Sequence, residues 1–164
     1  MKTTALAMLI GFLPVSGYAQ CADNERSVLE CTFKKGKKTV SVCISGDSIF
    51  YEYGKTGAKP DLRLVENIRD VDHLPWPGIG RSIWNETTFY NAEYSYSIYM
   101  SMDRMSDEHP IDAGIVVAKA GKELARLECD KKNLKIGLFE VSDTKKQFGQ
   151  CWDMEREKWR ACAD

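Results

Sequence analysis

The sequence predicts a mainly β protein: an antiparallel barrel or sandwich of about eight strands, with a short C-terminal helix and a framework of disulfides. Three observations support this fold class. Residues 94–102 place tyrosine, isoleucine or methionine at every second position, with serine at most of the positions between. Short β-prone segments alternate with turn residues along most of the chain. The chain also holds six cysteines, an even number.

The first four strands are expected before residue 67. A lysine-rich turn, Lys34-Lys35-Gly36-Lys37-Lys38, separates the first two strands, and Ser45-Gly46 separates the second from the third. A polar loop that ends at Pro60 precedes the fourth. The expected strands are 28–34, 38–45, 47–54 and 61–66.

The second half of the chain continues the pattern. Asn91-Ala92 separates two long strands, and Ala120-Gly121 is typical of a hairpin turn. The expected strands are 81–90, 93–102, 114–119 and 122–129, and 134–141 is a candidate for one more. Residues 153–162 are predicted as the helix, with Asp153 at its N-cap.

Residues 1–19 are predicted to be a cleavable signal peptide. Lys2 is followed by the apolar run 5–15 and by the small residues Gly17 and Ala19, so that cleavage is expected after Ala19. The apolar run is too short for a membrane span, and no other segment is long enough. Residues 20–164 are then expected to form a single β-rich domain in the periplasm or outside the cell.

Export gives the cysteines a structural role, because an oxidising compartment favours disulfides. Six cysteines allow fifteen connectivities. A turn centred near Lys37 would place Cys31 opposite Cys43, and Cys151 with Cys162 would close the last helix. Elimination leaves Cys21 with Cys129. A free catalytic thiol is not expected.

Charge and motifs argue against several functions. Removal of 1–19 leaves 22 basic and 24 acidic residues, which gives no basic field for nucleic-acid binding. Hydrolase elbows, zinc motifs and phosphate loops do not occur, so no catalytic residue, metal or cofactor is expected. His73 and His109 stand beside carboxylates in polar segments and are interpreted as solvated loop histidines.

The segment HLPWPGIGRSIW, residues 73–84, is the candidate partner-binding site. Two prolines exclude a buried strand up to Gly80, while Trp84 lies in the following strand and is expected in the core. Tryptophan and arginine are frequent in binding interfaces. Alternatively, Trp76 folds back as a structural lid. The candidate binding residues are His73, Trp76, Gly78, Gly80, Arg81 and Ser82.

Residues 29–130 resemble a group of small exported proteobacterial proteins through Gly36-Lys37, 51–57, 78–81 and 121–129. At the level of class, the size, export signal, disulfides and β-rich plan are similar to periplasmic lysozyme inhibitors and immunity proteins. The resemblance implies a non-enzymatic inhibitor or immunity protein for a peptidoglycan hydrolase. The mechanism we expect is occlusion, in which residues 73–82 fill the cleft of the enzyme and Arg81 pairs a catalytic carboxylate.

Two other functions stay open. A glycan- or envelope-binding protein would stack Trp76 and surface tyrosines on sugars, and a hydrolase is the third alternative. The lysine turn, Lys34 to Lys38, is either a solvated turn or a docking point for an anionic surface or an acidic partner.

Overall fold

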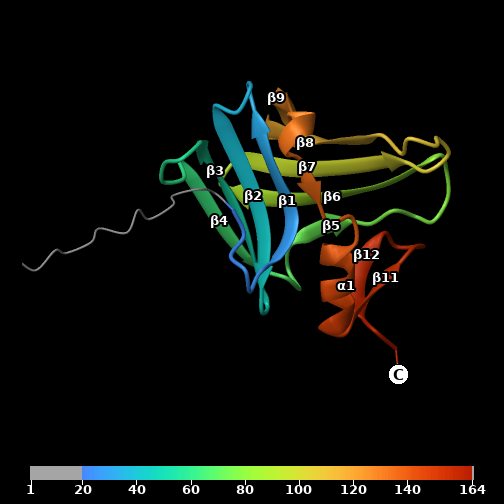
Figure 1. Cartoon of the computed structure of the whole chain (residues 1–164). Coiled ribbons are helices and arrows are strands. Elements are labelled where there is room, and N and C mark those ends of the chain that lie inside the picture. Colours follow the sequence, from blue (N-terminus) through green and yellow to red (C-terminus); the bar gives the residue numbers. More distant parts are fainter. Residues whose placement is uncertain (1–19, 164) are drawn as a thin grey trace, which may run out of the picture.

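The computed structural model describes residues 20–163, so the predicted signal peptide, 1–19, lies outside the described residues. Two five-stranded antiparallel sheets and a C-terminal hairpin make up the described fold, and the strands of one sheet run across those of the other (Figure 1). The sheets do not share a hydrogen-bonded ladder in this part of the chain. The arrangement is therefore a sandwich, and the mainly β prediction is confirmed.

The first sheet has the order β10-β1-β2-β3-β4. The four expected strands all form, because each presents apolar residues to the core and is bounded by a turn at positions where left-handed backbone is needed, such as Gly46. β10 adds a short edge, where Leu29 pairs with Ile136. The strands are β1 (Arg26–Phe33), β2 (Lys38–Ser45), β3 (Ser48–Lys55), β4 (Leu62–Asn67) and β10 (Lys135–Ile136).

The second sheet has the order β5-β6-β7-β8-β9. The period of two in β7 has the predicted effect at its centre, since Ile98 and Met100 are fully buried while Ser97, Tyr99 and Ser101 lie on the other face. β5 is a three-residue strand that the sequence pattern did not indicate. The strands are β5 (Asp72–Leu74), β6 (Ser82–Asn91), β7 (Tyr94–Asp103), β8 (Ile111–Lys119) and β9 (Lys122–Glu128).

The core lies between the two sheets. Tyr51 of β3 is fully buried, and its ring lies 5.6 Å from the rings of both Phe89 and Tyr96 in the opposite sheet. Aliphatic side chains from both sheets surround these rings, among them Val40, Val42, Ile49, Ile98 and Ile115. This burial is the main driving force that holds one sheet against the other.

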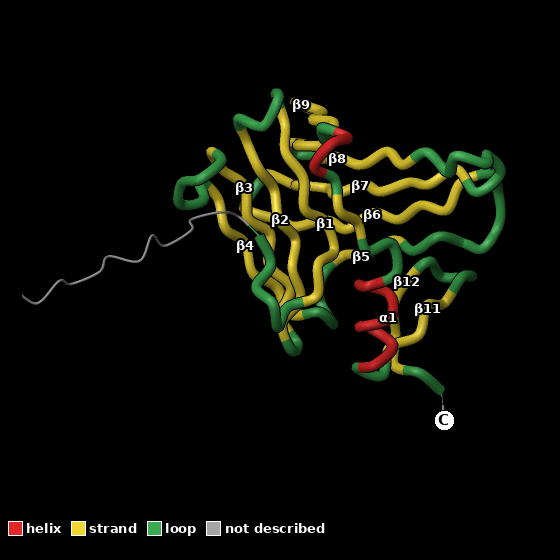
Figure 2. The backbone as a smooth tube through the Cα atoms, viewed as in Figure 1, coloured by secondary structure: helices red, strands yellow, loops and turns green. Residues whose placement is uncertain are grey.

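One short α-helix was predicted near the C-terminus, and one forms, but from other residues than those predicted. Residues 153–162 belong to a hairpin of β11 (Gln150–Asp153) and β12 (Lys158–Ala161), whereas α1 is formed by Glu140–Gln147, within and beyond the segment predicted as a last strand. Figure 2 shows α1 below the second sheet, beside this hairpin. A 3-10 turn, η1 (Lys131–Asn133), precedes β10.

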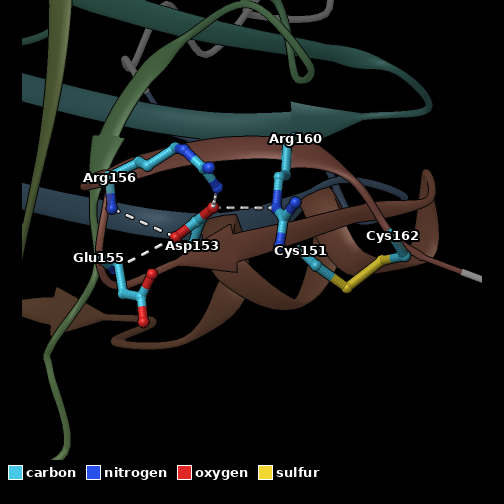
Figure 3. Close-up of polar contacts among 6 residues, drawn as sticks. All are labelled: Cys151, Asp153, Glu155, Arg156, Arg160 and Cys162. Carbon is cyan, nitrogen blue, oxygen red and sulfur yellow. Dashed lines mark hydrogen bonds and ion pairs between the residues drawn. A yellow bond between two sulfur atoms is a disulfide. The ribbon is translucent and has the colours of Figure 1, made fainter.

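Asp153 organises the turn of the C-terminal hairpin. Its carboxylate accepts hydrogen bonds from the backbone N–H of Glu155 (3.1 Å) and of Arg156 (3.2 Å), which closes the hairpin turn. The guanidinium groups of Arg156 (2.9 Å) and Arg160 (3.1 Å) pair with the same carboxylate (Figure 3). The residue predicted as a helix cap is thus the organiser of a turn.

The disulfides are Cys21–Cys43, Cys31–Cys129 and Cys151–Cys162. The Cys151–Cys162 prediction is confirmed, but the pairings Cys31–Cys43 and Cys21–Cys129 were wrong. The β1–β2 turn is centred before Lys37, so the register sets Cys31 opposite Val40 rather than Cys43. Cys31 instead bonds to Cys129, which directly follows β9. This disulfide links the two sheets.

Candidate functional site

Two neighbouring loops extend from one end of the second sheet, and we call them the loop pair. Residues 75–81 connect β5 to β6, and residues 104–110 connect β7 to β8. Figure 1 shows both loops reaching away from the body of the molecule at the right of the view. The backbone N–H of Arg104 donates to the carbonyl of Arg81 (3.2 Å), and the Arg104 Nε donates to the carbonyl of Gly80 (2.9 Å).

Contacts within loop 75–81 hold its shape. The Trp76 indole donates to the carbonyl of Ile79 (2.7 Å), and the guanidinium of Arg104 lies 5.1 Å from the centre of the Trp76 ring. Gly78 and Gly80 have φ of 87° and 95°, where a side chain would strain the backbone. As a result Ile79 is displayed at the tip, with 72% of its surface exposed.

Arg81 lies at the base of the same loop. Its Nε donates to the Asp103 carboxylate at 2.7 Å, while 70% of its side chain is exposed. Hydrogen bonds from the Met105 N–H and from Arg81 keep the pKa of Asp103 below its usual value, so this carboxylate stays charged. The ion pair orients the guanidinium and leaves most of its surface in solvent.

The structure brings most of the predicted binding residues together, with one exception. Trp76, Gly78, Gly80 and Arg81 belong to the loop, and Ser82 begins β6. His73, however, is 2% exposed, so its assignment as a solvated loop residue was wrong. The polar neighbours of His73 concealed the short strand β5, in which alternation turns His73 inward and leaves Leu74 exposed.

His73 joins three elements through hydrogen bonds. Its Nδ1 lies 2.9 Å from the Thr87 hydroxyl in β6, and its Nε2 lies 2.8 Å from the Ser142 hydroxyl in α1. Desolvation, and then the charge of Lys145, lower the pKa of His73 to about 3. A general base must accept a proton near the working pH, so this imidazole is poorly matched to activate Ser142. Its geometry fits a neutral imidazole that joins β6 to α1 through hydrogen bonds.

Lys145 is the second buried ionisable group in this region, with 1% of its surface exposed. Its ammonium donates to the carbonyl of Arg69 (3.2 Å) and lies 5.5 Å from the centre of the Trp159 ring. Burial lowers the pKa of Lys145 to about 8, although the charges of Asp70 and Asp72 oppose this shift. A hollow of about 300 Å³ separates these carboxylates from the C-terminal hairpin.

All four tryptophans of the chain line one pocket of about 200 Å³, which we call the tryptophan pocket. Trp84 lies on the pocket wall and is only partly buried, in contrast to its predicted place in the core. Trp152 and Trp159 face each other across the hairpin, with ring centres 5.6 Å apart. The lining residues are Pro75, Trp76, Trp84, Asn85, Leu138, Phe139, Ser142, Lys146, Trp152 and Trp159.

Asn85 supplies an unusual polar group to this pocket. It is 4% exposed, and its amide N–H donates to the carbonyl of Leu138, but its Oδ1 has no hydrogen-bond partner among the described residues. Buried polar atoms are rarely left unpaired in this way.

The sequence did not indicate the contribution of the C-terminal segment to the site. The helix prediction for 153–162 separated Trp159 from Trp152, whereas the hairpin pairs them directly. A usable signal was present: Cys151 and Cys162 flank a short polar stretch, which is the arrangement of a bridged hairpin. Nothing in the pattern around Lys145 indicated a buried amine.

Comparison with known proteins adds no assignment: no protein-family model, curated protein or solved structure matches the chain. Within residues 20–163, no helix is long and apolar enough to cross a bilayer. One group of potential metal ligands, Cys21, Glu25 and Cys43, is found in the same range, and its two sulfurs form a disulfide.

Proposed function

We propose that the protein is an exported binding protein that inhibits a cell-wall-degrading enzyme, of lysozyme or amidase type, by inserting the loop pair into its cleft. The observation that carries the proposal is Ile79, an aliphatic side chain displayed on a loop that is already held in one shape. A restricted loop loses little conformational entropy on binding, so more of its contact energy is available for affinity.

The composition of the loop pair supports a protein partner. Trp76, Arg81, Arg104 and Met105 are of the residue types enriched in protein interfaces, and Met105 is 68% exposed. Arg81 presents a planar set of donors suited to a carboxylate. Glycoside hydrolases carry paired carboxylates in their clefts, which makes Arg81 the residue that would pair a catalytic acid.

The experiment measures inhibition and binding with a panel of purified lysozymes and peptidoglycan amidases. We expect Ile79→Ser and Arg81→Ala each to weaken binding by about 2 kcal/mol, or roughly thirtyfold, with an unchanged melting temperature. Leu124→Ser is the matched control, since Leu124 is 55% exposed on β9, outside the loop pair. Equal effects of Ile79→Ser and Leu124→Ser, or no enzyme bound by the parent protein, would contradict the proposal.

The tryptophan pocket favours glycan binding as a second candidate function. Aromatic faces stack on the apolar face of a pyranose ring, and all four tryptophans line this pocket. A volume of about 200 Å³ fits a single ring rather than a larger ligand. The lining contains Lys146 and no carboxylate, which argues against a cationic ligand.

Titration with chitooligosaccharides and soluble peptidoglycan fragments separates the two candidates. If the pocket binds sugar, Trp152→Ala should abolish the change in tryptophan fluorescence, whereas Ile79→Ser should leave it intact. If neither ligand produces a saturable change in the parent protein, the pocket is a packing feature at the base of the loop pair.

A further inference from the structure

Two groups of lysines that are distant in the sequence meet at another end of the molecule. Lys34, Lys35 and Lys37 lie in the β1–β2 turn, and Lys131 and Lys132 lie in η1. Figure 1 shows the turn and the 3-10 turn after β9 together at the top of the view, away from the loop pair. All five side chains are exposed, and we call them the lysine patch.

Asp130 fixes the two segments against each other. Its carboxylate accepts hydrogen bonds from the backbone N–H of Gly36 (2.9 Å) and from the hydroxyl of Thr32 (3.0 Å). The Asp130 N–H donates to the carbonyl of Thr32 (2.7 Å), one residue away from the Cys31–Cys129 disulfide. The fold therefore holds the β1–β2 turn and η1 next to each other. Its centre is a hollow of about 520 Å³ lined by Lys35, Gly36, Asp130, Lys131, Lys132 and Asn133.

The positive charge of the patch is largely uncompensated. Within residues 20–163, only Lys131 has a carboxylate partner, Asp112 at 3.8 Å, and both side chains are 76% exposed. The hydrogen bond from the Gly36 N–H, together with that of Thr32, holds the pKa of Asp130 below its usual value and occupies the carboxylate. One of the five lysines thus has a carboxylate partner within residues 20–163, although residues 20–164 carry a net charge of −2.

The fold itself does not require lysines at these positions. Lysine often protects a free sheet edge, but β2 is flanked by β1 and β3, and the turn lies at the strand ends. Lys34 and Lys35 moreover adopt φ of 54° and 60°, a left-handed conformation that glycine and asparagine enter more readily. The backbone conformation at positions 34 and 35 therefore favours glycine or asparagine, yet both positions carry lysine.

We propose that the lysine patch docks the protein on an anionic phospholipid surface. Its five basic residues are all lysine, and no arginine or aromatic residue lines the hollow, whereas protein interfaces are enriched in arginine and aromatics and depleted in lysine. The flexible ammonium groups are spread over two segments, which suits many phosphates on a surface better than one bound ion. The proposal does not depend on the function of the loop pair.

The test is co-sedimentation of the protein, from residue 20, with vesicles of phosphatidylcholine alone or mixed equally with phosphatidylglycerol. We expect binding to the mixed vesicles only, at low ionic strength, with reversal by sodium chloride. The triple variant Lys35→Gln, Lys131→Gln, Lys132→Gln should lower the partition coefficient by roughly a hundredfold. The control is Lys119→Gln, Lys122→Gln, Lys158→Gln, which removes the same charge from exposed positions outside the patch and should retain most binding.

Three results would overturn the proposal. The first is no association of the parent protein with anionic vesicles at low salt, and the second is an equal loss of binding in the two triple variants. The third is displacement by inorganic phosphate at an ionic strength where sodium chloride has no effect, which would identify a site for a free phosphate. Binding to polyglutamate but not to vesicles would likewise overturn the proposal, and would indicate an acidic protein as the partner of the patch.

Discussion

Replacing Lys145 by methionine tests whether the fold buries a charged amine at a cost. The only hydrogen bond that Lys145 donates within residues 20–163 goes to the carbonyl of Arg69, which also accepts one from the Gln150 side chain (3.1 Å). The carbonyl thus keeps a donor in the variant, and methionine fills most of the space of the lysine stem. We expect Lys145→Met to be at least as stable as the parent protein at neutral pH.

The pH dependence of this difference follows from the pKa. Between pH 8 and 10.5 the folded amine has lost its proton while the unfolded amine retains it, so the unfolded state binds more protons. The free energy of unfolding of the parent protein therefore rises with pH in this window. A pKa of about 8 in place of 10.5 corresponds to at most about 3 kcal/mol, and we expect about 1–2 kcal/mol because the adjacent hollow admits solvent.

Urea unfolding, followed by circular dichroism, measures the effect in both proteins at neutral pH and near pH 10. Other groups that titrate in this range contribute equally to both proteins, so the comparison isolates Lys145. As the pH rises, the free energy of unfolding of the parent protein should increase relative to that of the variant. If the two stabilities change in parallel, or if Lys145→Met unfolds the protein, the description of Lys145 as a buried, penalised charge is wrong.

Two further predictions concern the disulfides and His73. Chain entropy predicts that removal of Cys31–Cys129, which spans 98 residues, lowers the free energy of unfolding by about 5 kcal/mol. Removal of Cys151–Cys162, which spans 11 residues, should lower it by about 3 kcal/mol. Double alanine variants compared by thermal unfolding should show this order, and a reversed order would contradict the prediction. The pKa of about 3 predicts that the ring protons of His73 keep a constant chemical shift in NMR titrations from pH 8 down to about pH 5, whereas a midpoint near 6 would mean that the imidazole is open to solvent.

The longer strands of the two sheets could be predicted because their information is local. At the centre of β7 the alternation of residues is also the alternation of burial, and in the β8–β9 hairpin Ala120-Gly121 supplies the left-handed turn. The segment 75–80 was likewise identified as a loop, since prolines and glycines constrain the backbone directly. These features need no knowledge of the rest of the chain.

The parts that could not be predicted depend on contacts between distant segments. Composition alone favours a helix over residues 153–162, whereas the segment pairs with β11 and is bonded to it through Cys151–Cys162. A one- or two-residue shift in the centre of the β1–β2 turn was enough to misassign two disulfides. His73 was placed in solvent because its partners, Thr87 and Ser142, lie far along the chain.

The order of the cysteines has a consequence for how the native protein is reached. Cys21 bonds to Cys43 while Cys31, which lies between them, bonds to Cys129. A chain synthesised from its N-terminus presents Cys21, Cys31 and Cys43 together long before Cys129 exists, and pairing between neighbours in sequence then gives the wrong bridge. Such a bridge is corrected only by attack of a remaining thiolate on it, so a molecule that forms it needs exchanging thiols as well as an oxidant to reach the native pairing.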